Sequence, residues 1–180
     1  MKRVILSSIL LACITAVPGR ARATATEVGT SRPFGLGVQA FEPTSLIGKL
    51  FLDRNNALDF GLGFWGYGHC YNNHGPYYCD RGNQAFSVHF DYLYEEPFVE
   101  VAPVRLDWHA GAGGRMLFNG YTDDNGTHDL AIFARIPIGV DVTFRRPRWL
   151  EAYLEVAPGL WIFPPLTFDI DVGLGVRAYF

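Results

Sequence analysis

Three residue types that can carry out nucleophilic chemistry stand together in one stretch of the sequence. Ser87, His89 and Asp91 are each two positions apart, and a serine, a histidine and an aspartate can form a relay that activates the serine hydroxyl. Residues two apart in a β-strand point in the same direction, so these side chains would lie parallel and would not converge on a substrate. We therefore predict no catalytic residues and expect His89 to belong to a polar network.

A cluster of histidines and cysteines is a second candidate. His69, Cys70, His74 and Cys79 are residue types that bind zinc. In an exported chain, however, two cysteines commonly form a disulfide because the compartment is oxidising. We predict a disulfide between Cys70 and Cys79, no metal ion and no cofactor, with zinc and two free thiols as the alternatives.

The beginning of the sequence predicts that the chain is exported. A short basic start is followed by an apolar stretch at 4–17 and by small residues at 21–23, which is the order of a secretory signal peptide. We predict a signal peptide at 1–23, with cleavage after Ala25 as the second choice, and a loose leader at 24–33. Lipidation of Cys13 is an alternative, because 10–13 loosely resembles a lipoprotein cleavage site.

The rest of the chain alternates apolar and polar residues. The 180 residues suffice for one domain, the net charge of −3 gives no reason to expect nucleic acid binding, and no apolar run in 34–180 is long enough for a membrane helix. Pro137 predicts a bulge, because it lacks a backbone donor. Alternation with a period of two predicts eight strands: 34–41, 44–52, 57–65, 85–94, 104–118, 129–144, 149–161 and 168–180.

The lengths of the connections favour a membrane barrel. If residue 180 lies on the periplasmic side, the connections at 53–56, 95–103 and 145–148 are periplasmic. The external loops are then 41–44, 66–84, 119–128 and 162–166. The two longest loops are both external, as in outer-membrane barrels. The loop at 66–84 is rich in tyrosine, which suits contact with an external protein or glycan, and the expected contact residues are Tyr67, Tyr71, Tyr77 and Tyr78.

One face of the strands carries the charges and many glycines. If the apolar face contacts lipid, the polar face lines a narrow interior, where each charge needs a partner. Glu151 and Glu155 would lie about 13 Å apart by strand rise, which is too far for a catalytic acid and base. We expect a plugged interior in which His89 and His109 join an ion network. The predicted network is Lys49, Asp59, Asp91, Arg105, Asp107, Arg115, Arg135, Asp141, Glu151, Glu155, Asp169, Asp171 and Arg177.

A soluble barrel would have the opposite polarity. A lipocalin-like periplasmic carrier holds its ligand against an apolar interior and exposes its charges to water. The apolar face of this chain has almost no charge at the strand centres, where each charge in lipid would cost about 2–4 kcal/mol. This favours the membrane barrel, and the soluble carrier stays an alternative.

With these features the chain resembles the small outer-membrane β-barrels represented by the OmpA membrane domain and OmpX. The ending Val176-Arg177-Ala178-Tyr179-Phe180 is similar to the signal that the barrel-assembly machinery reads, with Phe180 as its aromatic residue, and 37–49 and 56–63 look like a family of short bacterial barrels.

The resemblance implies an all-β, eight-stranded antiparallel up-and-down transmembrane barrel at 34–180, located in the bacterial outer membrane. It also implies contact with outer-membrane lipid and with the assembly machinery. Some small barrels modify lipid A with a histidine and a serine, so an enzyme that uses His89 is the alternative to the structural or surface-binding role that we expect.

Overall fold

The computed structural model describes residues 27–65, 70–71, 78–80, 86–123, 126–163 and 166–180. The elements in these ranges are all strands, and no helix among them is long and apolar enough to cross a membrane. The strands are β1 (Phe34–Glu42), β2 (Thr44–Phe51), β3 (Asn56–Trp65), β4 (Cys70–Tyr71), β5 (Tyr78–Asp80), β6 (Phe86–Val101), β7 (Val104–Asp123), β8 (Gly126–Arg135), β9 (Ile138–Phe144), β10 (Leu150–Phe163) and β11 (Thr167–Tyr179).

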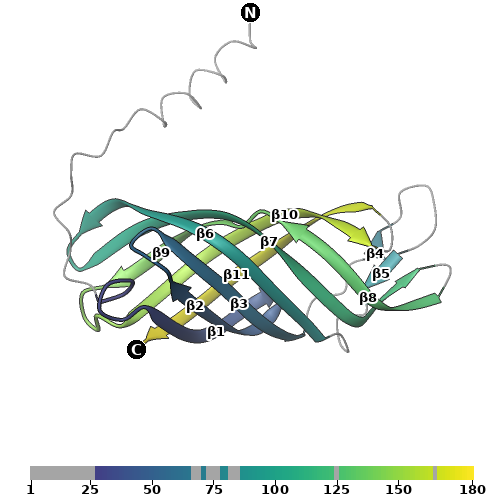
Figure 1. The fold of residues 1–180 in the computed structure, drawn as a ribbon, viewed down its shortest axis with the longest axis horizontal. Coiled ribbons are helices and arrows are strands. Elements are labelled where there is room, and N and C mark those ends of the chain that lie inside the picture. Colours follow the sequence, from purple (N-terminus) through teal and green to yellow (C-terminus); the bar gives the residue numbers. More distant parts are fainter. Residues whose placement is uncertain (1–26, 66–69, 72–77, 81–85, 124–125, 164–165) are drawn as a thin grey trace, which may run out of the picture.

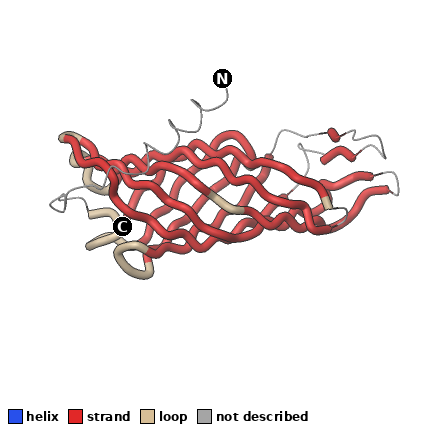
Figure 2. The backbone as a smooth tube through the Cα atoms, turned by 90° about the horizontal axis from the view of Figure 1, so that it is seen from above, coloured by secondary structure: helices blue, strands red, loops and turns tan. Residues whose placement is uncertain are grey.

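The strands form one antiparallel sheet that closes on itself. β1 pairs with β2 on one side and with β11 on the other, so the first and last long strands complete the ring seen in Figures 1 and 2. β4 and β5 form a small hairpin between β3 and β6, and β8 and β9 are two halves of one strand, because both pair with β7 and β10. The result is an eight-stranded up-and-down barrel, which confirms the predicted fold class.

The alternation of the sequence sets which side chains point inward. Along β11 the exposed positions are apolar, as at Ile170, Leu174 and Val176, whereas Asp171 and Arg177 are buried. Glycines on the inner face make room for large neighbours. A Cβ atom at Gly175 would lie 2.4 Å from the Tyr153 ring, which is closer than real atoms approach, so the interior is filled by pairing large side chains with glycine.

The two ends of the barrel differ. One end, here called the short-turn end, has connections at 52–55, 102–103 and 145–149, and the chain finishes there at Phe180. The other end, called the long-loop end, carries the β4–β5 hairpin and the far parts of β7 and β8 (Figure 1). At the short-turn end, Asp53 accepts hydrogen bonds from the backbone N–H groups of Asn55 (2.8 Å) and Asn56 (2.9 Å), which fixes the turn between β2 and β3.

The connection predicted at 95–103 is mostly strand. β6 continues to Val101 and pairs with β7 as far as Val101 and Val104, with a register shift between Pro97 and Val99. Proline was expected to end the strand, and that expectation was wrong. The pairing of β3 with β6 stops at Tyr94, so the side of β6 that lacks a donor at Pro97 needs no partner strand.

The loop predicted at 119–128 is also shorter than expected. β7 runs to Asp123 and β8 begins at Gly126, with Tyr121 paired with His128 and Thr122 with Thr127. The apolar alternation that marks a strand in contact with lipid is absent here, yet backbone pairing does not depend on it. The Asn125-Gly126 dipeptide, which is typical of tight hairpins, is the signal that could have predicted this arrangement.

Pro137 interrupts the strand without the predicted bulge. The ladder stops at Arg135 and resumes at Ile138. The register with β7 is unchanged, because Gly113 pairs with Arg135 and Ala110 with Ile138, three residues apart on both strands. Only the donor of Pro137 is lost, and its carbonyl still accepts from Gly111 at 2.9 Å.

The segment at 27–32 is docked on the short-turn end and is not a loose leader. Val28 is 1% exposed and packs with Phe51, Ala57, Leu93 and Tyr179. The Arg32 guanidinium donates to the Tyr179 carbonyl at 3.0 Å. This apolar contact explains why a stretch without alternation is ordered. The predicted signal peptide at 1–23 lies outside the described residues.

Candidate functional site

The charged side chains gather inside the barrel. Twelve of the thirteen predicted network residues are buried, and Arg105 is half-buried. The buried side chains of the described part of the chain include ten carboxylates but only four Lys or Arg residues, so each cation is shared among several carboxylates. The carboxylates are Glu42, Asp59, Asp91, Glu95, Asp107, Asp141, Glu151, Glu155, Asp169 and Asp171, and the cations are Lys49, Arg115, Arg135 and Arg177.

Lys49 is the cation of the half of the interior that lies toward the short-turn end. Its ammonium group forms an ion pair with Glu95 and lies 3.5 Å from Asp141 and 3.7 Å from Glu151. Lys49 is fully buried. An isolated buried ammonium would be costly, and three surrounding carboxylates offset that cost.

Arg177 links the Lys49 group to the neighbouring strands. Its guanidinium donates to Glu151 at 2.8 Å and also pairs with Asp59. The same group lies over the Tyr153 ring, 3.9 Å from the ring centre, where a cation is attracted to the aromatic face. The Tyr179 hydroxyl donates to Glu151 at 3.1 Å. These contacts hold both carboxylates and the arginine in one arrangement.

His109 connects the two halves of the network. Its Nδ1 atom lies 2.5 Å from Asp141 and its Nε2 atom 3.3 Å from Glu155. Both ring nitrogens therefore face carboxylates, an arrangement that suits a ring protonated at both positions. Gly139 leaves space for this ring, since a Cβ there would lie 2.5 Å from it.

Glu95, His109 and Asp141 place their ligand atoms within 4.8 Å of one another, close enough for metal binding. The Lys49 ammonium, however, pairs with both Glu95 and Asp141 and already supplies a positive charge to this group. We therefore assign the cluster to the ion network.

Arg135 is the main cation toward the long-loop end. It donates to Asp91 at 2.7 Å, to Glu155 at 2.9 Å and to Asp171 at 3.1 Å. Arg115 adds a second ion pair with Asp171 at 3.1 Å. Charge-assisted contacts of this kind hold the planar guanidinium in a fixed orientation.

Apolar clusters lie on both sides of the ionic layer. Toward the long-loop end, Phe133 and Trp161 stack with ring centres 5.0 Å apart and pack with Leu117 and Ala131. The Arg115 guanidinium lies 5.2 Å from the centre of the Trp161 ring. At the opposite end, Val28 and Phe51 belong to the other apolar cluster. The interior is thus filled by three layers, of which the middle one is ionic.

The predicted relay residues are not arranged as a relay. Ser87, His89 and Asp91 are all buried inside the barrel. The nearest recorded carboxylate of His89 belongs to Asp59, at 3.8 Å, whereas Asp91 is bound to Arg135. Glu151 and Glu155 likewise contact different cations, Arg177 and Arg135. These groups can neutralise one another, and the structure does not place a nucleophile beside a base among them.

Sequence reasoning missed two kinds of network residue. Glu95 was placed in a turn, although it continues the inward positions of His89, Asp91 and Leu93. Extending the period of two past the expected strand end would have found it. Tyr153 and Tyr179 were not assigned to the network, because a tyrosine on the polar face gives no signal that separates an interior partner from a surface residue.

The predicted loop sites are described only by their backbone. Cys70 and Cys79 are direct partners in the β4–β5 hairpin, as are Tyr71 and Tyr78, so the pairing brings the two cysteine positions together. Tyr67, Tyr77, His69 and His74 lie outside the described residues. The disulfide and the tyrosine contacts stay predictions. Phe180 is exposed next to the end of β11, and its role in assembly also stays a prediction.

Comparisons with known proteins give one structural likeness. No family model and no curated protein matches the sequence. Three chains of solved structures match, among them the N-terminal β-barrel domain of Pseudomonas aeruginosa OprF. That barrel is 13% identical, with a TM-score of 0.47, and the match covers 82% of this chain and 95% of that chain. The functional argument below rests on the geometry of this chain.

Proposed function

We propose that the protein is an integral outer-membrane β-barrel with a structural or surface-binding role through its external loops. The observation that carries the proposal is the polarity of the barrel. Large apolar side chains such as Leu62, Phe90 and Leu154 are about half exposed on the outside, while Lys49 and Arg177 are buried inside. An apolar outer face and a polar interior are the features of barrels that span a membrane.

The strand lengths and the aromatic residues support the same proposal. β3 has 10 residues and β11 has 13, and a tilted strand needs about 9–11 residues to cross a bilayer. Exposed aromatic pairs lie toward both ends of the barrel. Tyr94 and Trp108 are 5.7 Å apart near the short-turn end, and Phe64 and Phe86 are 5.7 Å apart near the long-loop end. Aromatic belts of this kind suit the two membrane interfaces.

The soluble alternative fits this polarity poorly. A periplasmic lipid carrier requires an apolar cavity, but the centre of this barrel is occupied by Arg135, His109 and their carboxylate partners. The lipid A-modifying alternative requires its histidine at the lipid-facing surface, and His89 is buried inside. We therefore propose a protein without enzyme activity.

The filled interior argues against an open pore. The ion pairs of Lys49, Arg135 and Arg177 cross the barrel from strand to strand, and an apolar cluster lies at each end. An eight-stranded barrel has room for little more than its side chains. We expect planar bilayers that contain the protein to show no steady conductance.

The surface-binding part of the proposal rests on the long-loop end. β5 pairs with the far end of β7, joining Cys79 to Thr122, so the hairpin extends the barrel sheet beyond its rim. A tyrosine-rich segment attached to a rigid sheet can offer contact area to a protein or glycan at low entropic cost. Expected binding partners are outer-membrane lipid around the barrel and an external ligand at these loops, with no nucleic acid.

Fractionation tests the membrane assignment. The protein should be recovered in the outer-membrane fraction, should require detergent for extraction, and should migrate faster on a gel before boiling than after it, because the folded barrel stays compact. Recovery in the periplasmic fraction without detergent would contradict the proposal. Substitution of His89 by alanine should leave the lipid A pattern unchanged, and an altered pattern would favour the enzyme.

A further inference from the structure

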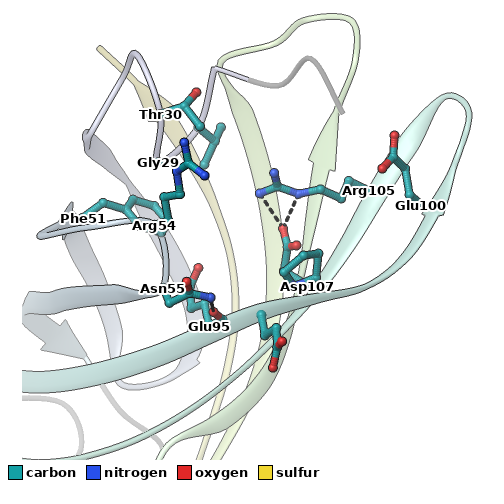
Figure 3. Close-up of a pocket in the computed structure, with 12 residues that line it drawn as sticks. Gly29, Thr30, Phe51, Arg54, Asn55, Glu95, Glu100, Arg105 and Asp107 are labelled. Carbon is teal, nitrogen blue, oxygen red and sulfur yellow. Dashed lines mark hydrogen bonds and ion pairs between the residues drawn. The ribbon is translucent and has the colours of Figure 1, made fainter. Parts of the chain in front are cut away.

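A cavity of about 420 Å³ opens at the short-turn end of the barrel. Figure 3 shows it between the segment at 28–30 with the turn at 52–55 on one side and the β6–β7 hairpin on the other. The space exists because β6 continues past the point where β3 stops pairing with it, at Tyr94. Its volume is in the range of small-molecule sites, about 300–1,000 Å³.

Asp107 lines this cavity and has an unused acceptor. One carboxylate oxygen accepts from the Arg105 guanidinium at 2.8 Å, as drawn in Figure 3. The other, Oδ1, is buried and has no hydrogen-bond partner among the described residues. Asp107 is only 3% exposed. Buried carboxylate oxygens without a donor are uncommon in native proteins, so a donor from a bound molecule would complete this group.

The lining favours a positive guest. Four carboxylates border the cavity, those of Glu95, Glu96, Glu100 and Asp107, against the guanidinium groups of Arg54 and Arg105. An anion would meet four like charges, whereas a cation meets two.

The walls of the cavity also include apolar groups. Val28, Phe51 and Pro97 contribute to the lining, so a guest with a hydrocarbon body would bury part of it there. The edge of β6 is a poor site for an added peptide strand, because Pro97 offers no backbone donor. A small molecule fits the lining better than a strand.

We propose that this cavity binds a small organic cation with a primary ammonium group on a short apolar chain, the ammonium donating to Asp107. The proposal is separate from the role of the external loops, since the cavity lies at the opposite end of the barrel. It adds a ligand site at the mouth of an interior that is otherwise filled by its own side chains.

Calorimetric titration of the full chain, purified in detergent, tests the proposal. The probe is pentane-1,5-diammonium, and the controls are the neutral pentane-1,5-diol and the dianion glutarate, which have the same carbon chain length. The diammonium should bind at least tenfold more tightly than the diol, and glutarate should not bind. Equal binding of the diol, or no binding of the diammonium, would overturn the proposal.

Two substitutions locate the binding. Asp107→Asn should weaken diammonium binding at least tenfold, because the charge that faces the ammonium is removed. Asp123→Asn, which makes the same change at the far end of the same strand, should leave the affinity within twofold. Unchanged affinity in Asp107→Asn would refute the site. If Asp107→Asn loses its heat-modifiable migration, the exposed Glu96 takes its place, and Glu96→Gln should weaken binding severalfold. An unchanged affinity there would also refute the site.

Discussion

Glu151 and Arg177 face each other on neighbouring strands and form a 2.8 Å ion pair inside the barrel. They are direct register partners of β10 and β11, and both are almost completely buried. Their contact continues across the interior, because Arg177 also binds Asp59 on β3. One arginine thereby joins strands on two sides of the ring.

Removal of the Arg177 charge should destabilise the barrel strongly. The variant Arg177→Met keeps much of the side-chain volume but leaves Glu151 and Asp59 buried without this cation. We expect a loss of about 3–5 kcal/mol in the free energy of unfolding, the usual result of breaking a buried ion pair on one side. Urea titration monitored by gel mobility measures it. Arg146→Met, at an exposed turn position, is the control and should change stability by less than about 0.5 kcal/mol.

The contact between Gly175 and Tyr153 predicts a second effect. Gly175→Ala places a methyl group 2.4 Å from the tyrosine ring, so the ring must move from its position under Arg177. Overpacking of this kind costs about 1–3 kcal/mol. The double variant Gly175→Ala with Tyr153→Leu should lose less than the sum of the two single variants, because the clash is absent. Strict additivity would show that the ring does not limit this position.

Charge on the outer face should be tolerated only away from its middle. Leu174 lies in the centre of β11 and is 47% exposed, and Leu166 lies just before β11 and is 74% exposed. If the barrel spans a membrane, Leu174→Arg should lower stability in lipid vesicles by about 2–4 kcal/mol, and Leu166→Arg by about 0–1 kcal/mol. A similar small effect at both positions would show that the middle of the face is not in contact with lipid.

The turn at Asp53 predicts a pH effect outside the membrane. Hydrogen bonds from the backbone of Asn55 and the side chain of Asn56 lower the pKa of the Asp53 carboxyl below its usual 3.8. A lowered pKa in the folded state means that the charged carboxylate stabilises the turn above the unfolded-state pKa. This contribution is lost as the pH falls through the folded-state pKa.

The variant Asp53→Ala tests this sign. Its deficit in stability relative to the unmodified protein should be constant near neutral pH and should shrink as the pH is lowered below about 4. Urea titrations of both proteins at several pH values give the difference. A deficit that grows on acidification would contradict the assignment.

The eight strands could be predicted because one period governs each of them. In β11, apolar residues such as Leu174 alternate with Asp171 and Arg177, and a single shift of register would reverse every side chain. That rule does not apply where both faces leave the lipid. The far end of β7 and the segment of β6 after Glu95 were therefore missed.

The interior could be predicted only as a set of residues. Its face was readable, because charges at every second position share one side of a strand. The partners were not, because His109 meets Asp141 from β9 and Glu155 from β10. Such contacts depend on strand register and on how far each side chain reaches across the ring.

The seam between β1 and β11 has a consequence for the order in which the barrel forms. Arg32 and the Tyr179 carbonyl that it contacts are 147 positions apart in the chain, and the other neighbouring long strands are joined by much shorter connections. The entropy lost on closing a loop grows with its length, and contacts between distant positions form slowly. We expect β1 to join β11 last, so that its amides become protected latest in pulse-labelled hydrogen exchange during refolding, and the segment that carries Val28 then seals a ring that is already complete.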